Sequence, residues 1–270
     1  TNARVGCQFS GGLDSSAVAC IARKVLPEDK KLNTYSAVYE TINQKYIEKI
    51  NEKEFQDSVT KSEGYAPHSF DSSLMSPLAD TNMYLDMMDE PFYWPNLYMS
   101  NECYRLACQD KISIILNGID GDSVISHGHE YFAHLFLTGR FIKLIHQAIL
   151  RGKVMGKDKF TSFRTYIINP FVRAPVAYLW HWFKCLASPN WNVNVLIRPA
   201  FARITNLRVR IRPRWPIHNS RTRHQKKMAT PLHTYGLEMF NIFSSYYGIE
   251  TRSPFYDRRI VQHCISLPPN

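Results

Sequence analysis

The sequence predicts an α/β protein: a parallel sheet with helices on both faces, followed by a mostly helical C-terminal part. Three observations support this prediction. Short apolar runs alternate with stretches of helical periodicity in the first part of the chain, which is typical of strands connected through helices. The clearest apolar run, at residues 112–116, has the length of a buried strand. After about Tyr131 helical periodicity takes over, and no convincing strand is found there.

The individual elements follow from local patterns. The first apolar run, residues 5–9, predicts a strand, and the helix after it, at about 15–26, is expected to end before Pro27. The remaining elements expected in this part are a strand at 33–39, a polar helix at 46–62, a strand at 66–70 and a helix at 97–109. Residues 166–186 are apolar but contain Pro170 and Pro175, which favours a helical hairpin over a membrane span. Residues 192–219 predict a loop or lid.

Composition and charge narrow the class of protein. The chain has 270 residues, 44% hydrophobic and 21% charged, which is ordinary for a globular protein with a sizeable core. Six cysteines form no CxxC pair, so we expect reduced thiols in a cytoplasmic protein. Between Arg140 and Lys227 there are 19 Lys or Arg and one acid. We interpret this block as a basic face that packs against an acidic neighbour, in preference to a nucleic-acid site.

Residues 10–16, Ser-Gly-Gly-Leu-Asp-Ser-Ser, lie between the first predicted strand and the first predicted helix. The glycines allow backbone N–H groups to face a bound anion, and the helix directs its N-terminus at the same place. Ser10, Ser15 and Ser16 add hydroxyl donors. Asp14 would repel a bare phosphate, so it is best explained as a ligand of Mg²⁺ that is bound with the phosphate. The string therefore predicts a site for Mg²⁺ and a pyrophosphate group, and it contains no Walker sequence.

This string resembles the loop of N-type ATP pyrophosphatases, which cleave ATP between its α- and β-phosphates. Residues 116–123, Leu-Asn-Gly-Ile-Asp-Gly-Asp-Ser, resemble the second acidic loop of asparagine synthetases, Gly-x-Gly-x-Asp-Glu after a buried strand. In that alignment Asp122 takes the place of the carboxylate that holds Mg²⁺ together with Asp14. Ile119, Asp120 and Ser123 depart from the family pattern, where Glu, Gly and a second acid stand.

Residues 250–257, Glu-Thr-Arg-Ser-Pro-Phe-Tyr-Asp, resemble the family segment Glu-x-Arg-x-Pro-Phe-Leu-Asp. Glu250 and Arg252 are expected to be buried, to pair and to shape a substrate pocket, while a purely structural role for the segment stays open. Asp89 and Glu90 precede a proline where these enzymes often carry Asp-Glu-Pro, so they are further candidates for that pocket.

The three matches occur in family order, so the chain is similar to the asparagine synthetase superfamily. The resemblance implies an adenine-nucleotide α-hydrolase-like fold, ATP and Mg²⁺ as cofactors, and amide formation from a small-molecule or peptide carboxylate through an acyl-adenylate. Residues 1–135 would form the ATP-pyrophosphatase core, and residues 136–270 a helical, basic substrate-side region. The residues implied to bind ATP or pyrophosphate are Gln8, Ser10, Gly11, Gly12, Leu13, Asp14, Ser15, Ser16, Ala37, Val38, Asn117 and Gly118; Asp14 and Asp122 would hold the metal.

The resemblance also implies parts outside the chain. A glutaminase domain that supplies ammonia would lie before Thr1, and a lysine that stabilises adenylation would lie beyond Asn270, so we expect the chain to be a fragment. Two alternatives stay open: a tRNA-modifying ATP pyrophosphatase, and a non-catalytic nucleotide-binding relative. A metal site at His127, His129, His134 and Glu130 is a weaker alternative to polar residues at a helix start.

Overall fold

A computed structural model describes residues 3–42, 46–47, 50–90, 96–125, 130–187, 197–205, 215 and 217–267. The chain forms two compact units, which we call the sheet unit (Thr1–Ser126 and Lys227–Ser266) and the helical unit (His127–Lys226 and Leu267–Asn270). The sheet unit therefore includes a late segment of the chain, residues 227–266. The functional division at residue 135 stays a prediction.

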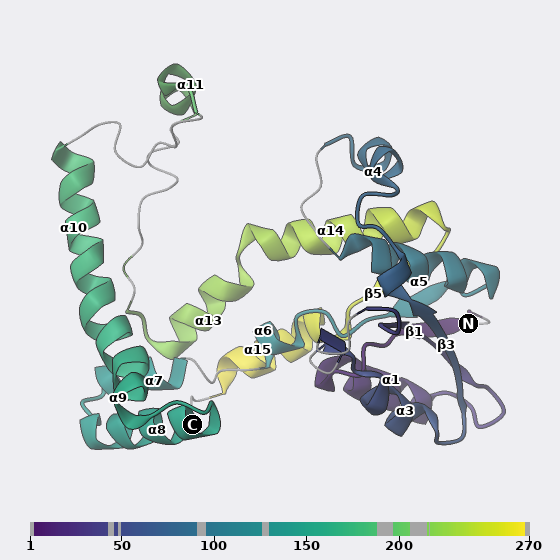
Figure 1. Cartoon of the computed structure of the whole chain (residues 1–270), viewed down its shortest axis with the longest axis horizontal. Coiled ribbons are helices and arrows are strands. Elements are labelled where there is room, and N and C mark those ends of the chain that lie inside the picture. Colours follow the sequence, from purple (N-terminus) through teal and green to yellow (C-terminus); the bar gives the residue numbers. More distant parts are fainter. Residues whose placement is uncertain are drawn as a thin grey trace. The chain divides into compact units, whose positions relative to one another are not determined.

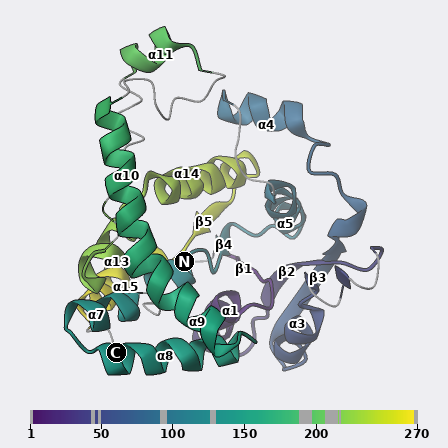
Figure 2. The ribbon, with the colours of Figure 1, turned by 60° about the vertical axis from the view of Figure 1, so that its left-hand side comes forward.

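The sheet unit contains a parallel sheet of five strands (Figure 1). Their order, β3-β2-β1-β4-β5, can be followed in Figure 2. All four strand pairings are parallel. The strands are β1 (Val5–Gln8), β2 (Leu32–Val38), β3 (Tyr65–Asp71), β4 (Ile114–Leu116) and β5 (Glu250–Arg252). Because β1 lies between β2 and β4, the strand order reverses beside it, and in such sheets the loops at the carboxyl ends separate there to leave a crevice.

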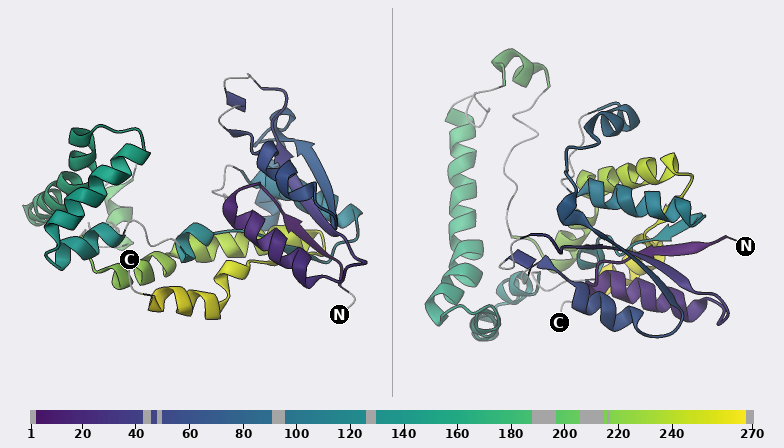
Figure 3. Two further views of the ribbon diagram at one scale, coloured as in Figure 1. Left: turned by 90° about the horizontal axis from the view of Figure 1, so that it is seen from below. Right: turned by 45° about the vertical axis from the view of Figure 1, so that its right-hand side comes forward.

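Helices cover both faces of this sheet (right panel of Figure 3). One face packs against α4 (Thr81–Met88), α5 (Leu97–Gln109) and α14 (Pro231–Tyr246) through a cluster that includes Tyr104, Ile115 and Phe243. The other face packs against α1 (Leu13–Val25), α6 (Gly121–Val124) and α15 (Arg258–Ser266). The remaining elements of this unit are α3 (Lys53–Thr60), η1 (Ser72–Leu74) and η3 (Pro254–Tyr256). The predicted fold class is confirmed.

The prediction that no strand follows Tyr131 is wrong, because β5 pairs in parallel with β4. Its three residues, Glu-Thr-Arg, are polar and too few to show an alternating pattern. The strand forms because the exposed edge of β4 offers backbone partners; the N–H of Asn117, for example, donates to the carbonyl of Arg252 at 3.0 Å. The observed strand β4 begins at Ile114 and is therefore shorter than the strand predicted at 112–116.

The polar helix predicted at 46–62 is interrupted among the described residues, and α3 begins only at Lys53. Asn51 explains the break. Its side-chain oxygen accepts from the N–H of Lys53 at 3.3 Å, and its side-chain nitrogen donates to the carbonyl of Tyr39 at 3.3 Å. An asparagine that bonds to nearby backbone in this way competes with the helix, so the chain turns at Asn51 and starts a new helix.

The helical unit contains a long uninterrupted helix in place of the predicted hairpin at 166–186 (Figure 2). It consists of α9 (Lys159–Phe163), the π-helical segment η2 (Arg164–Arg173) and α10 (Ala174–Ala187). Pro170 lies inside η2 and does not break the helix. The N–H of Ala174 donates to the carbonyl of Asn169, five residues earlier, so the helix has wider, π-type turns around the proline.

Further helices of this unit are α7 (Glu130–Leu137), α8 (Phe141–Val154), α11 (Pro199–Ile204) and α13 (Ser220–Met228), the last of which runs on into the sheet unit. Its core includes Leu135, Leu144 and Ala148, with the rings of Phe136 and Phe171 stacked at 4.3 Å between centroids. Most of the predicted loop at 192–219 lies outside the described residues. Among the helices that the structure describes, none is long and apolar enough to cross a membrane.

The end of β3 yields a prediction about acid stability. Hydrogen bonds from Ser73 and Thr41 lower the pKa of Asp71 from 3.8 to about 2. Because the pKa is lowered in the folded state, the ionised carboxylate stabilises the fold above pH 4, and this contribution is lost as the pH falls from about 4 to about 2. In urea titrations, Asp71→Ala should therefore be less stable than the parent protein at pH 6, and the difference should shrink at pH 2.5. An unchanged difference would contradict this assignment.

Candidate functional site

The loop between β1 and α1 presents backbone at the carboxyl edge of the sheet. Gly11 has φ +91°, and a Cβ there would lie 2.9 Å from the carbonyl oxygen of Glu52, so this position requires glycine. Ser15 Oγ donates to the carbonyl of Gly12 at 3.1 Å and accepts from the N–H of Ser10 at 3.2 Å. These bonds close the loop onto the first turn of α1. No side chain of the described residues caps α1, so its first N–H groups remain available to an anion.

The loop between β4 and α6 lies directly against this helix end. A Cβ on Gly118 would lie 2.5 Å from the backbone nitrogen of Ser15 and 2.9 Å from the carbonyl carbon of Asp14, so only glycine permits the approach. On the same loop, the N–H of Asp122 donates to Oδ2 of Asp14 at 3.2 Å. The two predicted metal ligands, which are 108 residues apart in sequence, are therefore neighbours.

The electrostatics of this pair favour a cation. Partial burial raises the pKa of Asp14, and the negative charge of Asp122 raises it further, while the hydrogen bond from the Asp122 backbone acts in the opposite direction. Both causes penalise the ionised form of Asp14 when no positive charge is nearby. A hard divalent cation between two such carboxylates would remove the penalty, and oxygen ligands are the ones that Mg²⁺ prefers.

A cavity of about 620 Å³ lies at these two loops. Among the predicted ATP, pyrophosphate and metal residues, those that line it are Gln8, Ser10, Gly12, Leu13, Asp14, Ser15, Ala37, Asn117, Gly118 and Asp122. The other three, Gly11, Ser16 and Val38, are not among its lining residues, and Val38 is 3% exposed within the sheet. The structure thus brings most of the predicted residues together around one hollow.

Ten further lining residues are not among those predicted to bind ATP, pyrophosphate or metal. They come from the ends of β1 and β4, from β2 and the segment after it, from α3 and the residues before it, and from α5: Phe9, Tyr35, Tyr39, Ile50, Glu52, Gln56, Met99, Ser100, Cys103 and Ile119. Gln56 is the most informative of these. It is 5% exposed, and its side-chain nitrogen donates to the carbonyl of Ser10 at 3.0 Å and to that of Ala37 at 3.2 Å. Gln56 therefore joins the glycine loop to the end of β2.

We expect Gln56→Leu to lower the free energy of unfolding by about 1–3 kcal/mol, because two carbonyl groups lose a buried donor while the volume stays similar. ATP affinity should fall with it, since the glycine loop loses its link to β2. Urea denaturation and calorimetric titration with ATP would measure both effects. The matched control is Gln109→Leu at the exposed end of α5, which should change neither quantity appreciably. Equal effects of the two variants would argue against the linking role of Gln56.

The four residues predicted to shape a substrate pocket lie outside this cavity. Glu250 and Arg252 do pair, with Arg252 Nε donating to Glu250 Oε1 at 2.8 Å, but both side chains are more than half exposed. The expectation that they are buried is wrong, because they sit on the edge strand of the sheet. Asp89 ends α4 with φ +54° and is exposed, as is Glu90. None of the four lines the cavity at the glycine loop, so a substrate-pocket role for them stays a prediction.

The described residues give little support for a cysteine nucleophile or for a histidine metal site. Burial raises the pKa of the Cys103 thiol to about 12, so the cysteine that lines the cavity is protonated at neutral pH and is not a nucleophile. Cys7, Cys20, Cys103 and Cys108 are free thiols. His127, His129 and the Glu130 side chain lie outside the described residues, so the histidine-metal alternative is not tested there; within the described part of the chain no three His, Cys, Asp or Glu residues form a metal-binding group.

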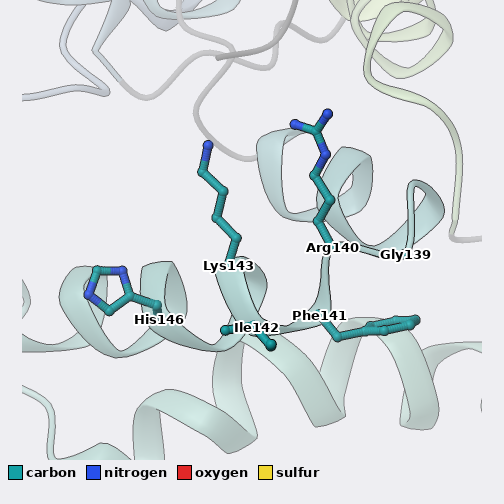
Figure 4. A pocket seen from close by; sticks show the side chains of 6 residues that line it. All are labelled: Gly139, Arg140, Phe141, Ile142, Lys143 and His146. Carbon is teal, nitrogen blue, oxygen red and sulfur yellow. The ribbon is translucent and has the colours of Figure 1, made fainter.

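A second hollow, of about 580 Å³, lies at the start of α8 in the helical unit. Figure 4 shows its six lining residues, with the side chains of Arg140 and Lys143 extending to the same side of the helix. It contains cations, a histidine and apolar side chains and none of the predicted site residues. The acid pair, the glycine loop and the uncapped helix end occur together only at the first cavity among the described residues.

Comparison with known proteins agrees with this geometry. A family model described as asparagine synthase matches residues 1–270. No curated protein matches the chain significantly.

Proposed function

Since the chain belongs to the asparagine synthase family over its whole length, we propose that it serves ATP-dependent amide formation through an acyl-adenylate. The observation that carries the proposal is the meeting of Asp14 and Asp122 beside a glycine loop and an uncapped helix N-terminus. This combination suits a nucleotide whose leaving group is pyrophosphate, because it offers N–H donors for the anion and carboxylates for its metal.

In this proposal, different residues would contact different parts of the nucleotide. The N–H groups in the first turn of α1 and the hydroxyl of Ser10 would bind the β- and γ-phosphates. Ala37 and Gly118, on opposite sides of β1, would border the nucleoside. Asn117 is 1% exposed, and its side-chain nitrogen has no hydrogen-bond partner among the described residues, so a nucleotide acceptor would satisfy it.

Asp14 and Asp122 fit Mg²⁺ by the chemistry of their oxygen donors and by the charge penalty described above. When bound, Mg²⁺ would neutralise charge that develops on the departing pyrophosphate. The role of the chain's own residues is to hold the phosphates in line for attack and to keep the leaving group in place. A lysine beyond Asn270 and glutamine-derived ammonia from a preceding domain remain part of the proposal.

In the proposed reaction an oxygen of the substrate carboxylate attacks the α-phosphorus of ATP, and the bond from that phosphorus to the bridging oxygen of pyrophosphate breaks. A nitrogen nucleophile then attacks the activated carbonyl carbon, loses a proton and displaces AMP. The products are an amide, AMP and pyrophosphate.

The test is to incubate the full-length protein with Mg-ATP, ammonium and single carboxylic acids, with aspartate first. Equal amounts of AMP and pyrophosphate, formed only with a suitable acid, would support amide synthesis. Formation of ADP and phosphate would contradict it, and so would the absence of nucleotide turnover with every acid. Salt-sensitive binding of tRNA together with acid-independent turnover would instead favour the tRNA-modifying alternative.

A further inference from the structure

Asp120 stands at the start of α6, between the end of β4 and the proposed metal ligand Asp122. Its backbone is left-handed, with φ +60°, a conformation that aspartate tolerates better than most residues. Its carbonyl oxygen accepts from the N–H groups of Ser123 at 2.9 Å and Val124 at 3.0 Å, which are the first bonds of α6. The position of Asp120 therefore determines where this short helix begins.

The Asp120 carboxylate is bound from two other elements of the sheet unit. Nδ1 of His233, in the first turn of α14, lies 2.9 Å from Oδ2, and the hydroxyl of Tyr256, in η3, donates to the same oxygen at 3.1 Å. The two rings are 5.9 Å apart between centroids. The side chains of Asp120 and His233 are only 27% and 15% exposed. The contact is thus largely enclosed, and it joins α6 to α14 and η3.

The same loop is attached to the sheet and to α1. The N–H of Asn117 donates to Arg252 of β5 at 3.0 Å, two residues before η3 begins, and the N–H of Asp122 donates to Asp14. Between these two attachments, the Asp120 carboxylate hydrogen-bonds the loop to α14 and η3. Val124 at the far end of α6 packs in the core with Phe255, so loss of the carboxylate contacts would loosen the first turn of α6, where Asp122 lies, and not the whole helix.

We propose that Asp120 is a positioning residue: bound by His233 and Tyr256, it fixes the start of α6 and so holds Asp122 at the Mg²⁺-pyrophosphate site. The inference rests on the proposed function only in naming Mg-ATP as the ligand. It explains why Asp120, whose backbone is left-handed, carries a charged side chain where the acidic loop of asparagine synthetases has glycine. Tyr256 stands where the family segment Glu-x-Arg-x-Pro-Phe-Leu-Asp has leucine. Two residues that differ from the family pattern by being polar therefore contact each other.

The test measures the Mg²⁺ dependence of ATP binding by calorimetry in the full-length protein. Asp120→Gly keeps the left-handed backbone and removes the carboxylate; it should raise the Mg²⁺ concentration for half-saturation about 10- to 100-fold, the usual effect of losing a group that orients a metal ligand. Asp120→Asn should recover part of the loss, because its amide oxygen can take the place of Oδ2 toward both groups but lacks the negative charge that strengthens these bonds. ATP binding without Mg²⁺ should change much less in both variants, which a general loss of structure would not allow.

Tyr256→Phe is the second variant, since it removes one hydroxyl and no packing volume. Its control is Tyr247→Phe, which removes a hydroxyl that donates to Asn101 at the same distance, 3.1 Å, in the same unit and away from the loop. We expect a rise in the half-saturating Mg²⁺ concentration for Tyr256→Phe alone. If Asp120→Gly and Tyr256→Phe both leave it within about twofold of the parent value, the positioning role is refuted. Because binding is measured without turnover, failure of the proposed reaction would not by itself overturn this inference.

Discussion

Replacing Asp14 or Asp122 with asparagine should reduce the rate of pyrophosphate release by at least about 100-fold. Loss of a single group that stabilises charge in the transition state typically lowers the rate by this amount. Each substitution keeps the size of the side chain and removes one negative charge from the metal site. The chain brings the two aspartates together beside the glycine loop, with the backbone nitrogen of Asp122 3.2 Å from Oδ2 of Asp14. Neither position can therefore substitute for the other. Steady-state assay of pyrophosphate in the full-length protein would measure the loss.

We expect Asp14→Asn to lose activity without losing stability. Burial and the charge of Asp122 raise the pKa of Asp14, so ionised Asp14 is a cost to the metal-free fold, and Asp14→Asn should be at least as stable as the parent in urea without Mg²⁺. Asp29→Asn, at an exposed position in the turn after α1, is the control and should change neither activity nor stability. Full activity in both Asp14→Asn and Asp122→Asn would refute the metal model.

Gly118→Ala should abolish ATP binding at concentrations that saturate the parent protein, and should lower the free energy of unfolding by about 1–3 kcal/mol. The new Cβ would lie 2.5 Å from the backbone nitrogen of Ser15 and 2.8 Å from its Cα. Contacts this short involve backbone on both sides and cannot be relieved by a rotamer change. The loop from β4 would have to move away from α1, which separates Asp122 from Asp14 and widens the site.

The matched control for Gly118→Ala is Gly156→Ala. Gly156 lies in the helical unit, and a Cβ there would meet no atom within 4 Å, so the change costs only the left-handed backbone, φ +67°. Calorimetry with Mg-ATP and urea denaturation would compare the two. Normal ATP affinity in Gly118→Ala would show that the two loops need not touch for binding, and would contradict the site as described.

Local sequence accounts for the parts of the site that depend on spacing. The Ser-Gly-Gly-Leu-Asp-Ser-Ser string identified the turn from β1 into α1, because glycine conformation, helix-end N–H groups and side-chain charge all act within a few residues. The same holds for residues 117–122 after β4. By contrast, Gln56 was not identified, since a polar helix position carries no local sign of the carbonyls that it will contact. The burial of Glu250 and Arg252 was predicted wrongly for the same reason: exposure depends on which strand is at the edge.

By itself, then, the sequence determined the α/β class, the strands β1 to β4 to within two residues, and the residue types of an anion and metal site, because these depend on periodicity and on neighbours in the chain. Only the tertiary structure decided that β1 and β4 are adjacent, that β5 extends the sheet, and that Asp120 is bound by His233 and Tyr256. Each of these contacts joins residues more than 100 positions apart. They follow from the packing of the whole sheet unit, for which no short stretch of sequence carries a signal.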